Sequence, residues 1–182
     1  MTPGRRRTAK VAVLVVVIVA GAVVLARGAD RPADPTLLPA AGRTPVAGFG
    51  EIGFHIERAF EREAVPAAER CALLAQTGEQ HSRGLMHRRD LSGYDGMLFD
   101  FGRPHTGTFW MKDTPMPLSI AWFDASGNFV SAADMEPCLD RSQCPSYAAT
   151  GPYRYALEVP KGGLAGLGIR PGSRLATTPA CR

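Results

Sequence analysis

Apolar and polar residues alternate in several short stretches between residue 46 and the C-terminus. In 97–101, 118–123 and 153–159 every second position is apolar or aromatic, which is the period expected for one face of a β-strand. Shorter apolar or alternating stretches predict further strands at 49–56, 71–75, 108–112, 129–132 and 174–177. The folded part of the chain is therefore predicted to be mostly β-structure.

Helical signals are few and short. Thr77 and Gln80 have the spacing of a capping box, which predicts a helix over 78–83 that ends at Gly84. A second helix, weakened by glycines, is predicted within 162–169. Turn residues separate the predicted strands at intervals of roughly 8–12 residues. The expected fold is a small β-barrel or sandwich-like domain with one or two short helices, covering residues 46–182.

The chain begins with a basic segment followed by an apolar one. Residues 1–10 carry four basic residues and no acid, and 11–26 is a run of sixteen residues without a polar side chain. As a helix this run would span roughly 24 Å, and Lys10 and Arg27 at its ends can reach the headgroups of a ~30 Å hydrocarbon core. We expect residues 11–27 to anchor the chain in a membrane. The alternative is a cleaved signal peptide that ends at Val24-Leu25-Ala26.

Either kind of segment would direct the rest of the chain out of the cytoplasm, as a single-pass membrane protein or, after cleavage, as a secreted one. The formal net charge of +4 is carried by the first ten residues, and the basic and acidic residues of the remainder balance. A folded part without excess basic charge is not expected to bind nucleic acid. Residues 28–45 hold four prolines among small and polar residues, which predicts an extended linker.

The four cysteines agree with an oxidising compartment. They are Cys71, Cys138, Cys144 and Cys181, and four cysteines allow three disulfide connectivities. Cys138 and Cys144 would close a short loop, and Cys71 paired with Cys181 would tie an early strand to the C-terminal tail. A zinc site is the other interpretation, but no histidine stands nearby at ligand spacing. Outside the cytoplasm disulfides are the usual state, so we expect two structural disulfides.

A polar cluster beside the aromatic residues is the main candidate for a ligand-binding surface. Trp110 alternates with Phe109 and Met111, so one face of this strand is predicted to be exposed. An exposed tryptophan among charged side chains suits a sugar ring, a peptide or another ligand with an apolar face. The other interpretation places Trp110 in the core, with the nearby acids capping turns or pairing with an arginine. The candidate residues are Arg88, Asp95, Trp110, Lys112, Asp113, Thr114 and Glu158.

Two alternative functions depend on other side chains. Ligands that favour Cu(I) are available at Met86, His87, Met97, His105, Met111 and Met116, although methionines in such a pattern commonly fill cores. Hydrolysis could use Glu158 with Asp95 or Asp113 as a pair of carboxylates. The chain has no G-x-S-x-G nucleophile motif. The sequence therefore favours a non-catalytic role and predicts neither a bound metal nor another cofactor.

Five short motifs occur in a fixed order between residues 71 and 175: R-G-L-M, G-M-L-F, F-W-M-K-D-T, P-L-S-I-A-W-F-D and A-L-E-V-P-K-G-G. In order and spacing they resemble the uncharacterised bacterial and archaeal family known as domain of unknown function 192. The resemblance implies a compact, mostly β domain that is often exported or tethered to a membrane, and it implies no activity. Ser119 and Ser173 stand where the family usually has acids.

These features predict a membrane-anchored, extracytoplasmic binding or accessory module of the bacterial envelope. Its partners are expected to be the membrane, through residues 11–27, and an unidentified small ligand or envelope component.

Overall fold

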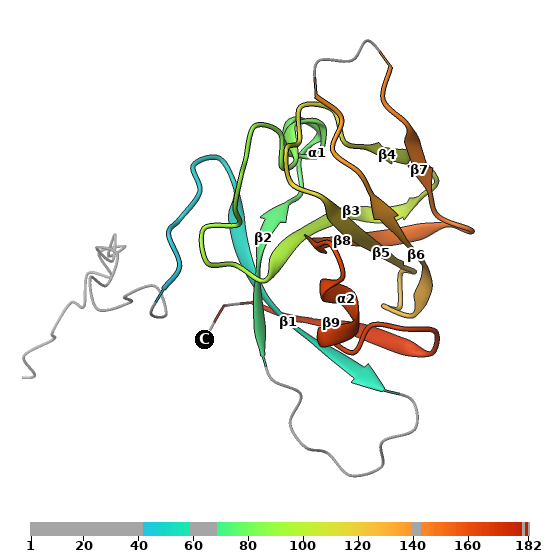
Figure 1. The fold of residues 1–182 in the computed structure, drawn as a ribbon. Coiled ribbons are helices and arrows are strands. Elements are labelled where there is room, and N and C mark those ends of the chain that lie inside the picture. Colours follow the sequence, from blue (N-terminus) through green and yellow to red (C-terminus); the bar gives the residue numbers. More distant parts are fainter. Residues whose placement is uncertain (1–41, 59–68, 140–142, 180, 182) are drawn as a thin grey trace, which may run out of the picture. The chain divides into compact units, whose positions relative to one another are not determined.

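A computed structural model describes residues 42–58, 69–139, 143–179 and 181 (Figure 1). All of them belong to one compact unit, Leu37–Arg182. The predicted anchor and most of the predicted linker lie outside the described residues. Among the residues that are described, no helix is long and apolar enough to cross a membrane.

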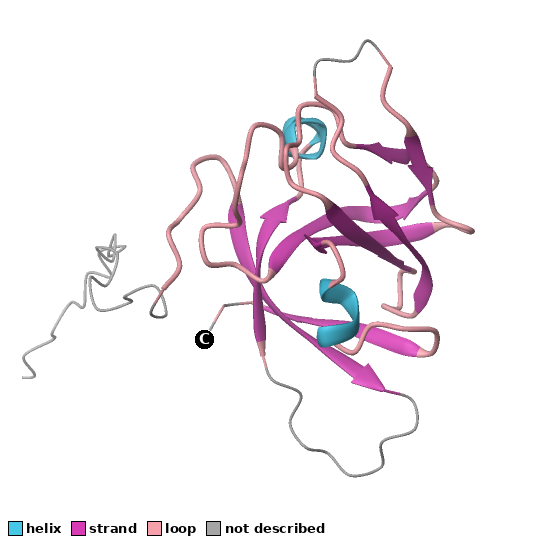
Figure 2. Ribbon diagram, viewed as in Figure 1, coloured by secondary structure: helices cyan, strands magenta, loops and turns pink. Residues whose placement is uncertain are grey.

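Nine strands and two short helices follow one another along the chain. They are β1 (Gly50–Arg58), β2 (Arg70–Ala75), α1 (Gly78–Arg83), β3 (Gly96–His105), β4 (Thr108–Trp110), β5 (Leu118–Phe123), β6 (Phe129–Met135), β7 (Ser146–Ala148), β8 (Tyr153–Pro160), α2 (Gly163–Gly166) and β9 (Ser173–Thr178). Figure 2 shows how strongly strands predominate over helices. The prediction of a mostly β domain with one or two short helices is confirmed.

Seven strands form one sheet in the order β6-β5-β8-β3-β2-β1-β9, and β4 pairs with β7 in a separate ribbon. All neighbours in the large sheet are antiparallel except β2 and β3, which α1 and the following loop connect in parallel. The sheet curls into a half-barrel (Figure 1). Its edge strands approach each other at one isolated bridge between Asn128 and Arg174, where the Leu175 amide donates to the Gly127 carbonyl at 2.8 Å.

The expected small β-barrel or sandwich-like domain is therefore confirmed in part, because the sheet is a curled half-barrel. Among the described residues, β6 and β9 meet at this bridge without forming a continuous ladder. Alternation predicts single strands and their turns, but it does not fix the tilt and register that decide whether a sheet closes.

Both faces of the curled sheet are packed, because successive side chains of a strand point to opposite faces. On one face Leu118, Ile120 and Trp122 of β5 join Met97 and other residues in a core that the β4–β7 ribbon covers. On the other face Ala121 and Phe123 join a second core, against which residues of the α2 segment pack. This double burial explains why every residue of β5 is buried.

The individual elements differ from the prediction mainly in length. The strand predicted at 97–101 continues to His105, and the helix predicted within 162–169 is reduced to four residues. The short strand β7 was not predicted. The helix over 78–83 is confirmed with its complete capping box, in which Thr77 accepts from the Gln80 amide and the Gln80 side chain accepts from Thr77.

Both expected disulfides are present. Cys71 of β2 is bonded to Cys181, with a Cα–Cα distance of 5.3 Å, and Cys138 is bonded to Cys144, at 5.8 Å. The first ties the centre of the sheet to the C-terminal segment, and the second closes the loop before β7. Among the described residues there is no free cysteine.

Candidate functional site

A cavity of about 550 Å³ lies between α1, the second half of β3 and β4. Its lining combines aromatic rings with a larger number of polar and charged side chains. The aromatic residues are Phe99, Phe101, Phe109 and Trp110, and the polar and charged residues include His81, Arg83, Arg103, His105, Thr114 and Glu158. This volume is in the range of small-molecule sites, and the lining is more polar than that of most such sites.

The aromatic wall is held in place by edge contacts between rings. Phe99 and Phe109 meet in a T-shaped arrangement with centroids 5.1 Å apart, and Phe101 meets Tyr153 in the same way at 5.5 Å. The Tyr153 hydroxyl donates to the Gly107 carbonyl at 2.9 Å, which fastens the turn between β3 and β4. Burial raises the pKa of Tyr153 to about 12, so this hydroxyl stays protonated and keeps its role as a donor.

Trp110 forms the exposed side of the cavity. It ends β4, pairs with Ser146 of β7 and is 52% exposed. The Lys112 ammonium lies 5.5 Å from the centroid of the Trp110 ring, close enough for a cation–π contact. Trp110 is therefore a surface residue, and the interpretation that placed it in the core is not supported.

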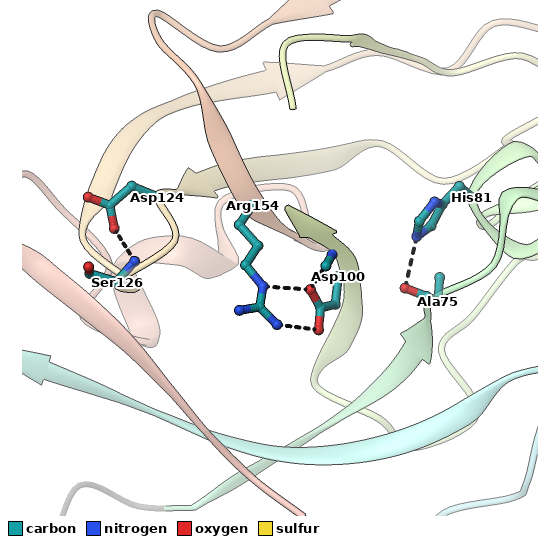
Figure 3. Close-up of polar contacts among 7 residues, drawn as sticks. Ala75, His81, Asp100, Asp124, Ser126 and Arg154 are labelled. Carbon is teal, nitrogen blue, oxygen red and sulfur yellow. Dashed lines mark hydrogen bonds and ion pairs between the residues drawn. The ribbon is translucent and has the colours of Figure 1, made fainter. Parts of the chain in front are cut away.

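Two histidines contact the Phe101 ring from different elements. His81 of α1 has its ring centroid 4.3 Å from that of Phe101, and His105 at the end of β3 stacks on it at 4.2 Å. His81 Nε2 lies 3.1 Å from the Ala75 carbonyl, a contact that directs the ring toward the end of β2 (Figure 3). Burial, followed by electrostatic interactions with His81 and Arg103, lowers the pKa of His105.

Glu158 provides the buried acid of the cavity. In register it stands between Met97 of β3 and Ile120 of β5, both buried apolar residues. Glu158 is 4% exposed, and among the described residues its carboxyl group has no hydrogen bond and no ion pair. Burial raises the pKa of Glu158 to about 8, so at neutral pH the group is mostly an uncharged hydrogen-bond donor.

The two arginines of the cavity have different roles. Arg83 stacks on Phe49, with its guanidinium carbon 4.3 Å from the ring centroid, and donates to the Gly48 carbonyl at 3.0 Å. Arg103 is exposed on β3 and, within the described part of the chain, makes no hydrogen bond or ion pair. By contrast, Asp100 on the same strand is held by Arg154 of β8 in a two-bond fork of 3.0 and 3.2 Å (Figure 3).

Comparison with known proteins identifies the family. The model of the family DUF192, described as Uncharacterized ACR, matches residues 62–177. The chain belongs to this family. The motifs between residues 71 and 175 had predicted this membership. No curated protein matches the chain significantly.

Two crystal structures resemble this DUF192 chain. One is a candidate transcription regulator from Sinorhizobium meliloti 1021, with a TM-score of 0.60 and 26% identity, covering 73% of this chain and 98% of that one. The other is a protein of unknown function from Novosphingobium aromaticivorans DSM 12444, with a TM-score of 0.57 and 27% identity, covering 74% of this chain and 90% of that one.

The DUF192 fold brings three of the predicted site residues to the cavity: Trp110, Thr114 and Glu158. Lys112 is adjacent through its contact with Trp110. Thr114 is buried, and its hydroxyl donates to the Lys112 carbonyl at 3.2 Å. Asp113 contributes through its backbone, because its amide donates to the Cys138 carbonyl at 3.0 Å.

Arg88 and Asp95 do not line the cavity. Arg88 donates to the Ser92 hydroxyl at 2.6 Å, within its own loop. Asp95 accepts from the Cys71 amide at 2.9 Å and lies 3.4 Å from an Arg70 nitrogen, so it caps the start of β2. Both side chains have structural partners that short sequence motifs do not reveal.

The sequence reasoning missed part of the cavity. His81 and Arg103 were not among the candidates, and Phe101 was assigned only to a strand face. Alternation at 97–101 indicated that Phe99 and Phe101 share a face, which is the one signal available. The position of α1 over that face depends on tertiary packing, which brings His81 to Phe101.

The serines that replace the family's usual acids are also satisfied by local contacts. The Ser119 hydroxyl donates to Asp134 and accepts from the Gly162 amide at 2.9 Å. The Ser173 hydroxyl donates to the Arg170 carbonyl at 2.7 Å. Neither serine lines the cavity, so both stabilise turns rather than contribute to the site.

The structure gives little support to the metal and hydrolysis alternatives. Met97 and Met111 are core residues of the packed sheet face. Among the His, Cys, Asp and Glu side chains of the described residues, the one group of three potential ligands is Glu51 with Cys71 and Cys181, and these two cysteines are joined in a disulfide. Of the residues in the Cu(I) hypothesis, Met86 and His105 line the cavity. Glu158 is the sole carboxylic acid among the described residues of the cavity wall, so no carboxylate pair forms there.

Proposed function

We propose that this DUF192 chain is a non-catalytic binding module of the cell envelope, and that its cavity takes a small molecule with a flat apolar ring. The observation that carries the proposal is the Glu158 carboxyl group, which faces the cavity without a partner among the described residues. A bound molecule that accepts a hydrogen bond from this carboxyl group would give it the partner that it lacks in the described structure.

The aromatic wall supports a ring as the apolar part of the ligand. Phe99, Phe101 and Phe109 present ring surfaces that are fixed by their contacts with each other and with Tyr153. Half-exposed Trp110 adds a large amphipathic surface at the entrance. Rings prefer offset or edge-to-face contact with such walls, so the cavity selects molecules by the shape of their apolar part.

Binding fits these residues better than catalysis does. The cysteines are oxidised, and the Thr114 hydroxyl already donates to a backbone carbonyl. Glu158 has no second carboxylate beside it in the described lining, so the cavity does not provide the carboxylate pair that glycoside hydrolysis uses. The regulator name of one structural neighbour suggests nucleic-acid binding, but the balanced charge after residue 10 does not favour it.

The proposed location rests on the sequence of the first 27 residues together with the disulfides. A basic segment before an apolar run is the pattern expected for a chain whose following domain lies outside the cytoplasm, where disulfides form. Fractionation of cells that produce the full chain tests this placement. We expect the chain in the membrane fraction and its domain accessible to protease added to spheroplasts. Recovery in the cytosol with free thiols would contradict it.

Calorimetric titration of the full-length protein in nanodiscs with phenylacetamide tests the site. This neutral probe has a ring for the aromatic wall and a carbonyl that can accept from Glu158. We expect Trp110→Ala to weaken binding about 10-fold or more. The matched control is Leu139→Ala, because Leu139 is also an exposed large apolar residue, at 47%, and does not line the cavity. Equal binding by wild type and Trp110→Ala, or no saturable binding, would overturn the proposal.

A further inference from the structure

The charges around the cavity are of one sign. Arg83 and Arg103 line it, and Lys112 stands beside it over Trp110. Glu158, the one acid among the described lining residues, is mostly uncharged at neutral pH because burial raises its pKa to about 8. A cavity with cations at its wall and a mostly uncharged acid attracts anions and repels cations.

We propose that the ligand is a ring-bearing monocarboxylate, with its carboxylate at Arg103, its ring on the aromatic wall and an acceptor oxygen at Glu158. This inference rests on the proposed function and narrows it to a chemical class. Aromatic walls alone would equally suit a quaternary ammonium ion. The guanidinium groups of Arg83 and Arg103 in the lining exclude that class by repulsion.

Arg103 is the residue on which the choice of anion depends. Within the described residues its guanidinium has no other partner, whereas that of Arg83 is already used by the Gly48 carbonyl and the Phe49 ring. A free guanidinium presents two parallel N–H groups, which match the two oxygens of one carboxylate. A phosphate monoester carries up to two charges and would require a second free cation in the lining, whereas Lys112 lies over Trp110 and outside the lining.

The contact between Lys112 and Trp110 supports the same orientation. The ammonium group lies 5.5 Å from the ring centroid, so positive charge is held at the outer side of the aromatic wall. Glu158 lies at the buried centre of the sheet between β3 and β5. A molecule with one charged end and one neutral acceptor is therefore complementary when its carboxylate lies near the exposed side, at Arg103.

The test uses the full-length protein and the 4-acetyl derivatives of three compounds of similar size, named below by the parent compound: phenylacetate, its neutral analogue phenylacetamide, and phenyl phosphate. The acetyl oxygen of each probe supplies the acceptor for Glu158. We expect the affinity for phenylacetate to be at least about 10 times that for phenylacetamide at low salt. This ratio of affinities should fall as added salt screens the charge. Arg103→Gln should bring the ratio close to one. The matched control is Arg89→Gln, which removes an exposed arginine outside the cavity lining and should leave the ratio intact.

The outcomes separate this inference from the proposed function. If phenylacetamide binding depends on Trp110 but the wild-type ratio is near one, the cavity is a binding site and the anion class is wrong. If phenyl phosphate binds more tightly than phenylacetate, or if Arg103→Gln retains the ratio, the monocarboxylate assignment is overturned. If none of the three ring probes binds saturably, the proposed function and this inference fail together.

Discussion

At the scale of single residues, Glu158 is the most informative side chain of this protein. A carboxyl group between Met97 and Ile120 exchanges water for apolar neighbours, and in the described structure no donor replaces that water. Its ionised form is therefore penalised in the folded state and unpenalised in the unfolded chain. The free energy of folding therefore depends on the protonation state of this one group, and so would the binding of the proposed ligand.

Replacement of Glu158 by glutamine should change how stability depends on pH. The folded-state pKa of about 8 lies above the unfolded value of 4.5, so the favourable contribution of Glu158 is complete below 4.5 and is lost as pH rises through 8. The neutral amide of Glu158→Gln does not ionise. We therefore expect the free energy of unfolding of the variant to rise relative to that of wild type between pH 5 and 9, by an amount on the order of a few kcal/mol.

Urea unfolding of both proteins at several pH values measures this difference. The control is Glu57→Gln, because Glu57 is exposed on β1. The difference in unfolding free energy between this variant and wild type should stay constant across the pH range. Parallel stability curves for wild type and Glu158→Gln would show that the Glu158 carboxyl group is solvated or paired in solution.

At the scale of elements, the sequence predicts what is local and misses what depends on packing. The strand 118–123 and the helix 78–83 are recovered with their bounds, because alternation and a capping box are encoded by adjacent residues. The ribbon strand β7 has three residues and no period long enough to detect. Within the site, Trp110 and Glu158 are recovered from residue type, whereas the contact between His81 and Phe101 requires the return of α1 over β3.

The contact between the β5–β6 turn and β9 depends on a glycine. Gly127 has a φ of +83°, and an added Cβ would meet the backbone carbonyl of Leu175, whose amide donates to Gly127. Gly162 has the same φ of +83° but open space around it. We expect Gly162→Ala to cost about 1–2 kcal/mol of unfolding free energy, the cost of a left-handed backbone for a residue with a Cβ.

Gly127→Ala should cost more than Gly162→Ala, because it adds a backbone clash to the same conformational cost. The additional loss of unfolding free energy in Gly127→Ala measures how much the contact between the β5–β6 turn and β9 contributes to the stability of the half-barrel. Thermal unfolding of the two variants side by side gives the comparison. Equal losses would mean that β9 shifts away from the turn without consequence for stability.

At the scale of the whole molecule, the two disulfides have different reach. Cys71–Cys181 joins residues 110 apart in sequence, and Cys138–Cys144 joins residues 6 apart. In the chain-entropy description a cross-link destabilises the unfolded state by an amount that rises with the length of the closed loop. The long-range bond also fastens the C-terminal segment to β2, a central strand of the sheet.

We therefore expect unequal costs when each pair is replaced by alanines. Cys71→Ala with Cys181→Ala should lower the free energy of unfolding by about 4–5 kcal/mol, and Cys138→Ala with Cys144→Ala by about 2 kcal/mol. Urea unfolding of the two double variants under oxidising conditions measures both values, and each variant controls for the loss of a cystine as such. If the short loop costs as much as the long one, native-state packing around the Cys138–Cys144 loop, rather than unfolded-chain entropy, dominates. The predicted order would also make the whole domain, and with it the cavity, dependent on an oxidising compartment, because loss of the long-range bond alone is comparable to the net stability of a small domain.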